Sequence, residues 1–585
     1  MAVMLLSATF ISAQGTGDNY IEIEFLSDEP TEYGIRLFGS EDGKLNVFWG
    51  DDTESEVTDL KKDGTFLKGT SKARLMKIYG NISTIECSNA PVKDIRVDHM
   101  PMLREYITRR TAVSNVDFSK NPDIEVVFIE NTEVSELDLS LNARLDSVIV
   151  PTNKLKSIVL PENNNISVIN CMSNGPLKKM NIGEARNIER LVTIQTNLSE
   201  MDLSEMKNLT YLEMGLGMLS VNLKLPVESR LDTLIAPMAG LYEIDLTACK
   251  NLKVLSLDNN WGLESIDLSQ LPELRVLEAE GCALSEINTS ANTKLEYLKC
   301  NNTPVTSLDL SNNPELKYLF CFATYLSELD LSACNKLEEL DCSYNFDIKA
   351  LKLPESIYSV DCTSCQLEEL EVGHLKSLAT LTCAENMIRT LNLGAQHKEL
   401  TALNANDNLI NEIDLKDLPM LFNVNLSNNP IKKLDVSAAN MLVLLNINGT
   451  CLDVAALDNL YNSLYDASEC DYSPILENQV DDASISSTSI ATGKGWMVTV
   501  EGDGSGSVET SVTDIDGGLQ LLNVENGLRI KGIEHATHNV SVYDINGMCI
   551  VEKTMKPGDN FVPLTRQGEY IVKINGVKTF KFIHK

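Results

Sequence analysis

The chain has 585 residues, with 84 acidic and 49 basic side chains and a formal net charge of −35 at pH 7. Such a charge argues against binding to nucleic acid or to an anionic membrane surface; it favours solubility, or attraction of basic partners. The length exceeds what one ordinary globular core fills, and no apolar run approaches the about 20 residues needed to span a bilayer.

The first segment, residues 1–13, has the features of a secretory signal peptide. The apolar run 3–11 leads to the small residues Ser12 and Ala13, which resembles an h-region followed by a cleavage site. We expect cleavage after Ala13. A basic n-region is missing, so we interpret the start as either displaced or truncated, and the true translation start stays open.

Residues 14–80 are predicted to form a small β domain. Alternating runs at 20–25, 34–38 and 44–49 are separated by Gly and Asp, as in short antiparallel strands. The stretch 46–52, NVFWGDD, resembles the strand-end motif of PKD-like β-sandwich modules of bacterial surface proteins. We expect this domain to cover the open end of the repeats that follow.

From residue 81 to about 452, an apolar residue followed by x-x-apolar-x-apolar returns every 20 to 22 residues. A fixed period of this length predicts a solenoid, here of about 18 coils. The repeats open at Ile82, Leu103, Ile124, Leu145, Ile166, Ile188, Leu209, Leu231, Leu252, Leu274, Leu295, Leu316, Leu337, Ile357, Leu378, Leu400, Leu421 and Leu442.

Each repeat begins with a half-buried strand. In the best unit, Leu295, Leu298 and Cys300 alternate with polar residues. Because one coil cannot bury its apolar side alone, neighbours must stack into a parallel sheet. The eighth residue after the opening one is mostly short and polar, and we interpret it as a partner of buried backbone groups rather than as a site. In ten successive repeats this column contains Asn260, Cys282, Thr303, Thr324, Asn345, Cys365, Asn386, Asn408, Asn429 and Thr450.

The pattern L-x-x-L-x-L-x-x-N/C/T-x-L is that of a leucine-rich repeat. Units with Cys at the third apolar position resemble the cysteine-ladder repeats of internalin J-like bacterial surface proteins. The resemblance covers residues 81 to about 460, and it implies adhesion to host or microbial surfaces. The ladder residues are Cys87, Cys171, Cys300, Cys321, Cys342, Cys362 and Cys383.

The ladder thiols are predicted to be buried and mostly free. Stacked side chains point in parallel, which disfavours the torsion that a disulfide requires. The C-x-x-C at Cys362 and Cys365 combines a ladder position with a polar-column position, so we interpret it as structural rather than as a redox or metal motif. Cys451 and Cys470 flank the end of the array and are the favoured pair for a disulfide, whose formation stays open.

Residues 453–500 are predicted to cap the other end of the repeats. Apolar spacing over 454–465 fits an amphipathic helix. The stretch 489–496, SIATGKGW, leads into a strand at 497–500 and resembles the closing segment after the repeats of Bacteroidetes surface proteins. The Gly-, Ser- and Asp-rich residues 501–518 are interpreted as a flexible linker, and they lack the spacing of an EF-hand calcium loop.

Residues 519–585 are predicted to form a compact β module, with strands at 528–532, 540–544, 549–553, 569–574 and 578–583. The pieces VYDING (542–547) and GEYIVKING (568–576), followed by a basic tail, resemble the C-terminal sorting domain of the Por (type IX) secretion system. This resemblance implies export across the outer membrane of a Bacteroidetes-type bacterium, removal of the domain, and surface attachment or release of the remainder. Another small immunoglobulin-like module is the alternative.

The sequence offers no catalytic signature. HExxH, GxSxG and Walker-type loops are missing, and the six His are scattered. We therefore predict a non-enzyme without cofactor or metal. One column of aspartates recurs at the same position of many repeats, and we interpret it as a solvated face or as turn partners. The column contains Asp138, Asp202, Asp245, Asp267, Asp309, Asp330, Asp414 and Asp435.

The third and fifth residues of each unit are expected to point outward from the concave sheet face. There, Tyr297, Tyr318 and Phe320 should lie side by side next to an acidic stripe. Clustered aromatics resemble interface hot spots, although the rings could instead serve only to stabilise the sheet. The predicted binding residues are Tyr297, Lys299, Tyr318, Phe320, Phe322, Glu339, Asp341 and Asp361.

These expectations combine into one hypothesis. The chain is predicted to be a secreted, monomeric leucine-rich repeat protein, attached to the cell surface at the outer membrane, that binds a protein partner through the concave sheet face. The acidic stripe favours a basic or cationic partner. The alternative is a glycan-binding or structural component of the cell envelope. Secretion machinery would recognise the C-terminal domain; no nucleic acid or membrane insertion is expected.

Overall fold

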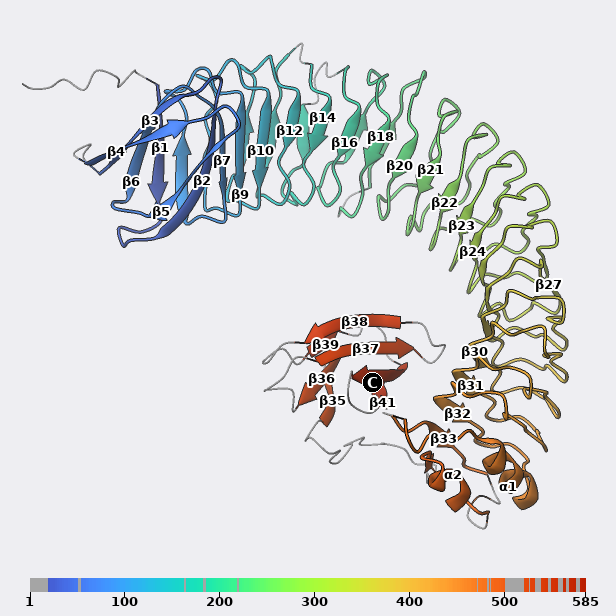
Figure 1. Ribbon diagram of the computed structural model, residues 1–585. Helices are drawn as coiled ribbons and strands as arrows, with labels where there is room; N and C mark the ends of the chain where they lie inside the picture. The colour runs from blue at the N-terminus through green and yellow to red at the C-terminus, as the bar shows by residue number, and fades with distance from the viewer. Residues whose placement is uncertain are drawn as a thin grey trace, which may run out of the picture. The chain divides into compact units, whose positions relative to one another are not determined.

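The computed structural model describes residues 19–50, 54–162, 165–181, 186–217, 220–470, 472–480, 483, 486–499, 520–524, 527–531, 538–544, 549–555, 561–563, 568–574 and 579–584 (Figure 1). The chain divides into two compact units, Met1–Leu284 and Ser285–Lys585, called here the first and the second unit. The predicted signal segment 1–13, the linker 501–518, Asp51, Asp52 and the turn at 545–548 lie outside the described residues.

The fold is mainly β, with 29% strand and 3% helix, and contains a leucine-rich repeat solenoid of about 19 turns. This confirms the predicted fold class and agrees with the expected number of about 18 coils. In the unit at Leu295, the three predicted inward residues Leu295, Leu298 and Cys300 are all fully buried. Hydrophobic burial along a stack of identical positions therefore forms the core.

The first unit opens with an antiparallel sheet. Its strands alternate between a buried face, which includes Ile21 and Ile23, and an exposed charged face. In spatial order the strands are β4 (Glu54–Leu60), β3 (Gly43–Trp49), β6 (Leu75–Tyr79), β1 (Tyr20–Phe25) and β8 (Val92–Arg96).

A second antiparallel pair joins this sheet to the solenoid. Strand β2 (Glu32–Gly39) pairs with β5 (Thr65–Thr70) on one side and with β7 (Ile82–Ser88), the first solenoid strand, on the other. Strand β7 then pairs in parallel with β9 (Glu105–Arg109). Strand β2, backed by β5, thus covers an edge of the parallel sheet that would otherwise present unpaired backbone groups.

The rest of the first unit repeats the same coil. Its parallel ladder continues through β10 (Val126–Glu130), β12 (Ser147–Ile149), β14 (Val168–Asn170), β16 (Arg190–Val192), β18 (Tyr211–Glu213), β20 (Thr233–Ile235), β21 (Val254–Ser256) and β22 (Val276–Glu278). Shorter strands lie on the opposite side of the coils: β11 (Glu136–Asp138), β13 (Ser157–Val159) and β15 (Lys179–Asn181) form one sheet, and β17 (Glu200–Asp202) and β19 (Asn222–Lys224) another.

The second unit continues the repeat with its own parallel ladder, and each strand pairs with the next in register. The ladder contains β23 (Tyr297–Lys299), β24 (Tyr318–Phe320), β26 (Glu339–Asp341), β28 (Ser359–Asp361), β29 (Thr380–Thr382), β30 (Ala402–Asn404), β31 (Asn423–Asn425), β32 (Leu444–Asn446), β33 (Ile475–Glu477) and β34 (Met497–Thr499). On the opposite side, β25 (Leu329–Asp330) pairs with β27 (Leu351–Lys352).

A helix lies between β32 and β33, where the sequence predicts one. Helix α1 (Val454–Ser463) begins after Asp453, whose side chain accepts a hydrogen bond from the Ala456 N–H at 2.8 Å. The helix buries Leu457, Leu460 and Tyr461. A short helix, α2 (Ser489–Gly493), precedes β34. These elements supply apolar cover at the last coils, as repeat arrays require.

The last described strands form two antiparallel sheets. One contains β35 (Gln520–Val524), β36 (Gly527–Lys531) and β39 (Phe561–Pro563). The other contains β38 (Cys549–Met555), β37 (His538–Asp544), β40 (Gly568–Ile574) and β41 (Thr579–His584). Five of these strands overlap the predicted ones, and Val540, Val542 and Val572 are buried.

The ladder cysteines are buried and free, as predicted. Burial raises the pKa of the Cys300 and Cys383 thiols to about 12, so both are protonated. The favoured disulfide between Cys451 and Cys470 is not formed, and both thiols are exposed. The two residues belong to separate turns, since the Cys451 N–H bonds to Ile431 and the Cys470 N–H to Ala467.

The polar column serves the backbone, as interpreted from the sequence. Asn345 Nδ2 donates to the carbonyl oxygens of Cys321 and Cys342 at 2.8 and 2.9 Å. Its Oδ1 accepts from the Thr324 hydroxyl at 2.6 Å and from the Leu326 N–H at 3.2 Å. One side chain therefore links two successive coils through groups that are otherwise buried without partners.

The repeated aspartates are turn partners. Asp330 Oδ1 accepts from the backbone N–H and the hydroxyl of Ser332, at 3.1 and 2.6 Å. The Lys352 ammonium, bonded to the other oxygen, and these Ser332 bonds lower the pKa of Asp330 to about 2. The same bond from the residue two positions on recurs at Asp138, Asp202, Asp245, Asp267, Asp309, Asp414 and Asp435.

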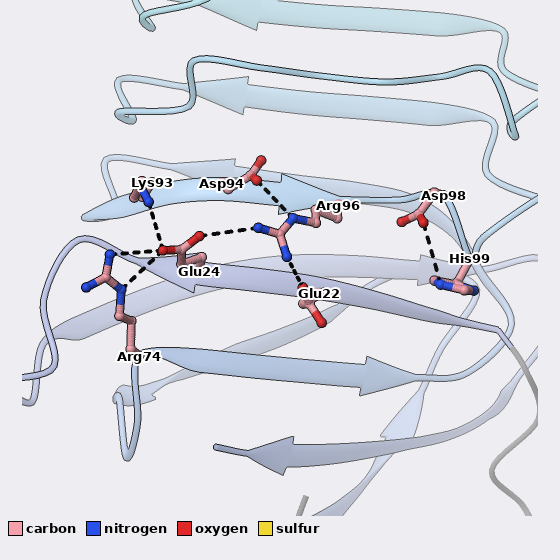
Figure 2. A network of polar contacts seen from close by, with 8 residues as sticks. All are labelled: Glu22, Glu24, Arg74, Lys93, Asp94, Arg96, Asp98 and His99. Atoms are coloured by element: carbon pink, nitrogen blue, oxygen red, sulfur yellow. Dashed lines mark hydrogen bonds and ion pairs between the residues drawn. The ribbon is translucent and has the colours of Figure 1, made fainter. Parts of the chain in front are cut away.

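Charged side chains cover the exposed face of the N-terminal sheet (Figure 2). Glu24 on β1 accepts from Lys93 at 2.9 Å and from Arg74 at 3.0 Å. Arg96 on β8 reaches both Glu22 and Glu24, the latter at 3.4 Å. The network is a cross-strand ladder of opposite charges, which stabilises pairing between adjacent strands.

Within the described ranges, no helix is long and apolar enough to cross a lipid bilayer.

Candidate functional site on the sheet face of the second unit

All the predicted site residues except Phe322 lie on four successive strands of one sheet. Strands β23, β24, β26 and β28 pair in register, so Tyr297 lies beside Tyr318 and Phe320 beside Asp341. Asp341 in turn pairs with Asp361. In each strand the middle residue is buried and its two neighbours are half-buried. The period of two therefore places the predicted aromatic and acidic residues on one face of the sheet. Adjacent strands of a sheet are about 4.8 Å apart.

The aromatic residues contact one another. The Tyr297 ring lies 6.1 Å from that of Tyr318, centroid to centroid, and 5.5 Å from that of Phe320. The interplanar angles of 47° and 45° are tilted rather than face to face. This arrangement leaves ring faces and edges at the surface while the rings support each other, as in preorganised interface clusters.

The remaining predicted residues border this cluster. Lys299 lies in register with Phe320 on β24. Phe322 lies in the turn after β24, and its backbone N–H donates to Asn301 Oδ1 at 3.0 Å. The ring contacts described around Tyr297 involve Tyr318 and Phe320, so the structure places Phe322 at the margin rather than within the cluster.

The acidic residues are held in defined orientations. Asp341 Oδ1 accepts from the N–H and hydroxyl of Ser343, at 3.0 and 2.6 Å. Asp361 Oδ1 accepts from the Thr363 N–H at 2.9 Å. Each carboxylate has a second oxygen for which no bond is described, so both can accept hydrogen bonds from a ligand.

Desolvation opposes ionisation of this stripe. Burial, together with the Asp341 charge, raises the pKa of Asp361 to about 6, despite the bonds from Thr363 that favour its ionised form. Burial and the same neighbour also raise the pKa of Glu339. Like charges crowded on a half-buried surface are relieved by a bound cation, which makes the stripe electrostatically suited to a basic group.

Charged residues flank the aromatic cluster on its other side. The Lys317 ammonium contacts Glu296 at 2.8 Å, and this contact raises the pKa of Lys317. The Tyr318 hydroxyl donates to Glu338 Oε2 at 3.3 Å. The cluster thus has a polar rim, as interfaces with an apolar centre commonly do.

Sequence reasoning missed four exposed aromatics near these strands, one of which, Tyr358, directly precedes β28 and is 55% exposed. Tyr325 and Phe346 are 65% and 61% exposed, and Tyr344 is 48% exposed with its ring 6.3 Å from that of Phe346. Tyr325 and Phe346 occupy the tenth position of successive repeats, a column that has Gln366 in the next repeat and continues as Met387 and Leu409. Aligning the repeats by that position, rather than by the strand alone, would have revealed this exposed column.

No metal centre is apparent in the part of the chain that the structure describes, since no three His, Cys, Asp or Glu side chains converge there. The acidic stripe, Glu339, Asp341 and Asp361, lies along successive strands, and its carboxylates do not converge on one ion position.

No family model matches the chain, and neither does any curated protein. Solved structures with a similar fold include the functional domain of InlJ from Listeria monocytogenes, which contains a cysteine ladder, at 17% identity, covering 86% of this chain and 91% of that one, with a TM-score of 0.45. YopM from Yersinia enterocolitica is 19% identical, covering 63% and 83%, with a TM-score of 0.45. A leucine-rich repeat protein of Leptospira interrogans is 16% identical, covering 63% and 90%, with a TM-score of 0.35. At such values, the fold assignment rests on the repeat geometry of this chain itself.

Proposed function

We propose that this chain is a binding protein that captures a basic segment of a protein partner through the sheet face of its second unit. One observation carries the proposal: the ring cluster of Tyr297, Tyr318 and Phe320 lies in register beside Asp341 and Asp361. Aromatic faces attract Lys and Arg cations, and adjacent carboxylates pair with them. The two parts together fit a segment in which cationic and apolar side chains alternate.

Partial burial makes this surface more selective than an exposed acidic patch. Solvent screens freely exposed ion pairs, which contribute little affinity. Asp361 is desolvated before any ligand arrives, as its raised pKa indicates. A cation placed between Asp341 and Asp361 would relieve their repulsion, so binding and loss of the Asp361 proton should be linked.

The test is a binding screen of the full chain against arrays of extracellular proteins and of glycans. The key variant replaces Tyr297, Tyr318 and Phe320 by Ala. The matched control replaces Tyr325, Tyr344 and Phe346 by Ala, which removes a similar aromatic area outside the sheet face. We expect a protein partner to bind wild type and control equally, and the sheet-face variant at least about tenfold more weakly, as loss of hot-spot residues predicts.

Other outcomes separate the alternatives. Loss of binding in the control alone would move the site to the exposed aromatic column. Binding only to glycans, lost in the sheet-face variant, would favour the glycan-binding reading, because aromatic rings also stack on sugars. Absence of any ligand on either array would contradict the proposal and favour a structural role in the envelope.

We also propose that the protein is secreted and displayed at a bacterial cell surface. The support is the sequence itself: the apolar residues 3–11, the stretches at 542–547 and 568–576 that resemble a type IX sorting domain, and a division into segments at about residues 13, 80, 452, 500 and 518. In this proposal the domain 519–585 is removed after export from a Bacteroidetes-type cell. Mass spectrometry of peptides shaved from intact cells should then lack those beyond about residue 518; recovering them from mature surface protein would contradict removal.

A further inference from the structure

A groove opens in the first unit on the side of the coils opposite the parallel ladder. It has a volume of about 790 Å³ and lies between two successive coils, with residues 223–229 on one side and residues 244–251 on the other. That volume lies within the range of about 300–1,000 Å³ typical of ligand pockets. None of the functions considered above uses this groove.

The groove exposes apolar side chains at positions that are buried in the preceding coil. Leu223, Leu225 and Ile244 are only partly buried. The equivalent Met201 and Leu203 of the preceding coil, like Leu246 across the groove, are at most 2% exposed. At its rim, Val227 is 81% exposed, the highest value among the large apolar side chains described. Apolar surface left open in this way favours a ligand with apolar side chains.

One wall of the groove is the unpaired edge of a strand. Strand β19 pairs with β17 through bonds from the Asn222 N–H to Ser199 and from the Leu203 N–H to the Lys224 carbonyl. Because a parallel ladder uses alternate residues, the N–H and C=O of Leu223 and the N–H of Leu225 point away from β17. Within the described residues these three groups have no hydrogen-bond partner.

The charges around the groove leave one cation uncompensated. Lys224 pairs with Asp202 at 3.2 Å, and Glu228 with Lys207 at 3.2 Å. Asp245 accepts from the N–H and hydroxyl of Thr247. In contrast, no carboxylate among the described residues lies within ion-pair distance of Lys250, which also lines the groove.

We propose that this groove binds an extended polypeptide segment, which adds to β19 as a further strand. Only a main chain offers alternating acceptors and donors at the spacing of Leu223 and Leu225, as in β-strand addition. The apolar walls select apolar side chains at alternate positions, and Lys250 selects a carboxylate. The site is independent of the sheet face of the second unit and would take a different partner.

The probe is a short fluorescein-labelled peptide in which Val alternates with Thr and Glu, titrated with the full chain by fluorescence anisotropy. We expect saturable binding. Two methylated versions of the peptide are compared, one N-methylated at its Val residues and one at its Thr and Glu residues, because the donors that face β19 belong to the first set in antiparallel and to the second in parallel addition. One of the two should bind at least about tenfold more weakly. Leu223→Pro removes the outward N–H and leaves the groups bonded to β17 in place, so it should weaken binding similarly.

A charge exchange keeps the proposal testable if Leu223→Pro does not fold. Lys250→Glu should weaken binding of the Glu-containing peptide and strengthen binding of a peptide with Lys in place of Glu. The matched variant Lys120→Glu, outside the groove, should change the affinity for neither peptide. Equal binding of the methylated and unmethylated peptides would overturn strand addition. Absence of binding at millimolar peptide, or the same affinity for Lys250→Glu and wild type, would overturn the site.

Discussion

At the scale of single residues, the polar column decides whether adjacent coils stay joined. Asn345 satisfies the carbonyls of Cys321 and Cys342 and also accepts from Thr324 and Leu326. The column tolerates Thr where fewer bonds are needed: the Thr324 hydroxyl donates only to Cys321 at 3.1 Å and to Asn345. Asn345 thus makes more bonds than Thr324 and ties its own coil to the preceding one.

We expect Asn345→Ala to destabilise the second unit by about 3 kcal/mol, because it leaves several buried backbone groups without partners. Asn345→Thr should have an intermediate effect, since Thr restores the bond that Thr324 makes at its own position. Urea denaturation followed by circular dichroism measures both. Equal stability of Asn345→Ala and wild type would mean that water replaces the amide.

Asp361 should make stability depend on pH in the sense opposite to most carboxylates. Its pKa is raised from 3.8 to about 6 by burial, so the folded state binds a proton more tightly than the unfolded state. The contribution of Asp361 to folding stability therefore becomes less favourable as pH rises from about 4 to about 6, and it is most unfavourable above about pH 6. The full shift corresponds to about 3 kcal/mol.

Asp361→Asn should therefore stabilise the protein at pH 7 by up to about 3 kcal/mol and have little effect below about pH 4. The difference in urea midpoint between variant and wild type, measured across this range, isolates the effect. Asp309→Asn is the control: the bonds from Ser311 lower the pKa of Asp309, so that variant should show no gain at neutral pH. A gain for both would indicate relief of net charge instead.

At the scale of elements, hydrogen-bonded carboxylates orient strands and turns. The face of the N-terminal sheet carries Glu24 between Lys93 and Arg96, both on β8, and Arg74, which directly precedes β6 (Figure 2). The bond from Lys93, followed by that from Arg74, lowers the pKa of Glu24. The stability that Glu24 contributes is thus present at neutral pH and lost as pH falls through its lowered folded-state pKa.

Glu24→Gln should destabilise the first unit by about 1 kcal/mol at low ionic strength, the upper end for surface ion pairs, because several cations share the carboxylate. The effect should shrink in 1 M salt, where screening acts over about 3 Å, and also at acidic pH. Thermal melts compared with Glu29→Gln, an exposed position outside the network, measure it. An effect that ignores salt would indicate lost packing.

At the scale of the whole chain, repetition made much of the architecture predictable. The repeat period gave the solenoid, and the alternation around Leu298 gave the face on which Tyr297, Tyr318 and Phe320 lie. The pKa of Asp361 could not be predicted, because its desolvation depends on side chains of neighbouring strands. The groove beside β19 was equally hidden, since Leu225 and Leu246 occupy equivalent positions in the repeat pattern although only Leu246 is fully buried. The distance between two coils depends on how their side chains pack, whereas both coils share the same repeat pattern in the sequence.

The covered edge of the parallel sheet leads to a prediction about solubility. Removing residues 19–79 deletes β2 and β5 and leaves β7 without its antiparallel partner. An exposed strand edge pairs readily with other chains, so we expect the truncated protein to form oligomers or aggregates where the full chain does not. Size-exclusion chromatography with light scattering distinguishes the two. A monodisperse truncated monomer would show that β2 and β5 are dispensable for solubility.

The cysteine ladder lets local unfolding of the second unit be followed coil by coil through the reactivity of its own thiols. Cys300, Cys321, Cys342, Cys362 and Cys383 sit one per coil, fully buried and protonated. Only an exposed thiolate reacts with an alkylating reagent, so each sulfur stays silent until its own coil separates from the stack. The order in which the five thiols become labelled would therefore report the order in which the coils unfold. No introduced probe is needed, and the result would show from which end the stack unfolds.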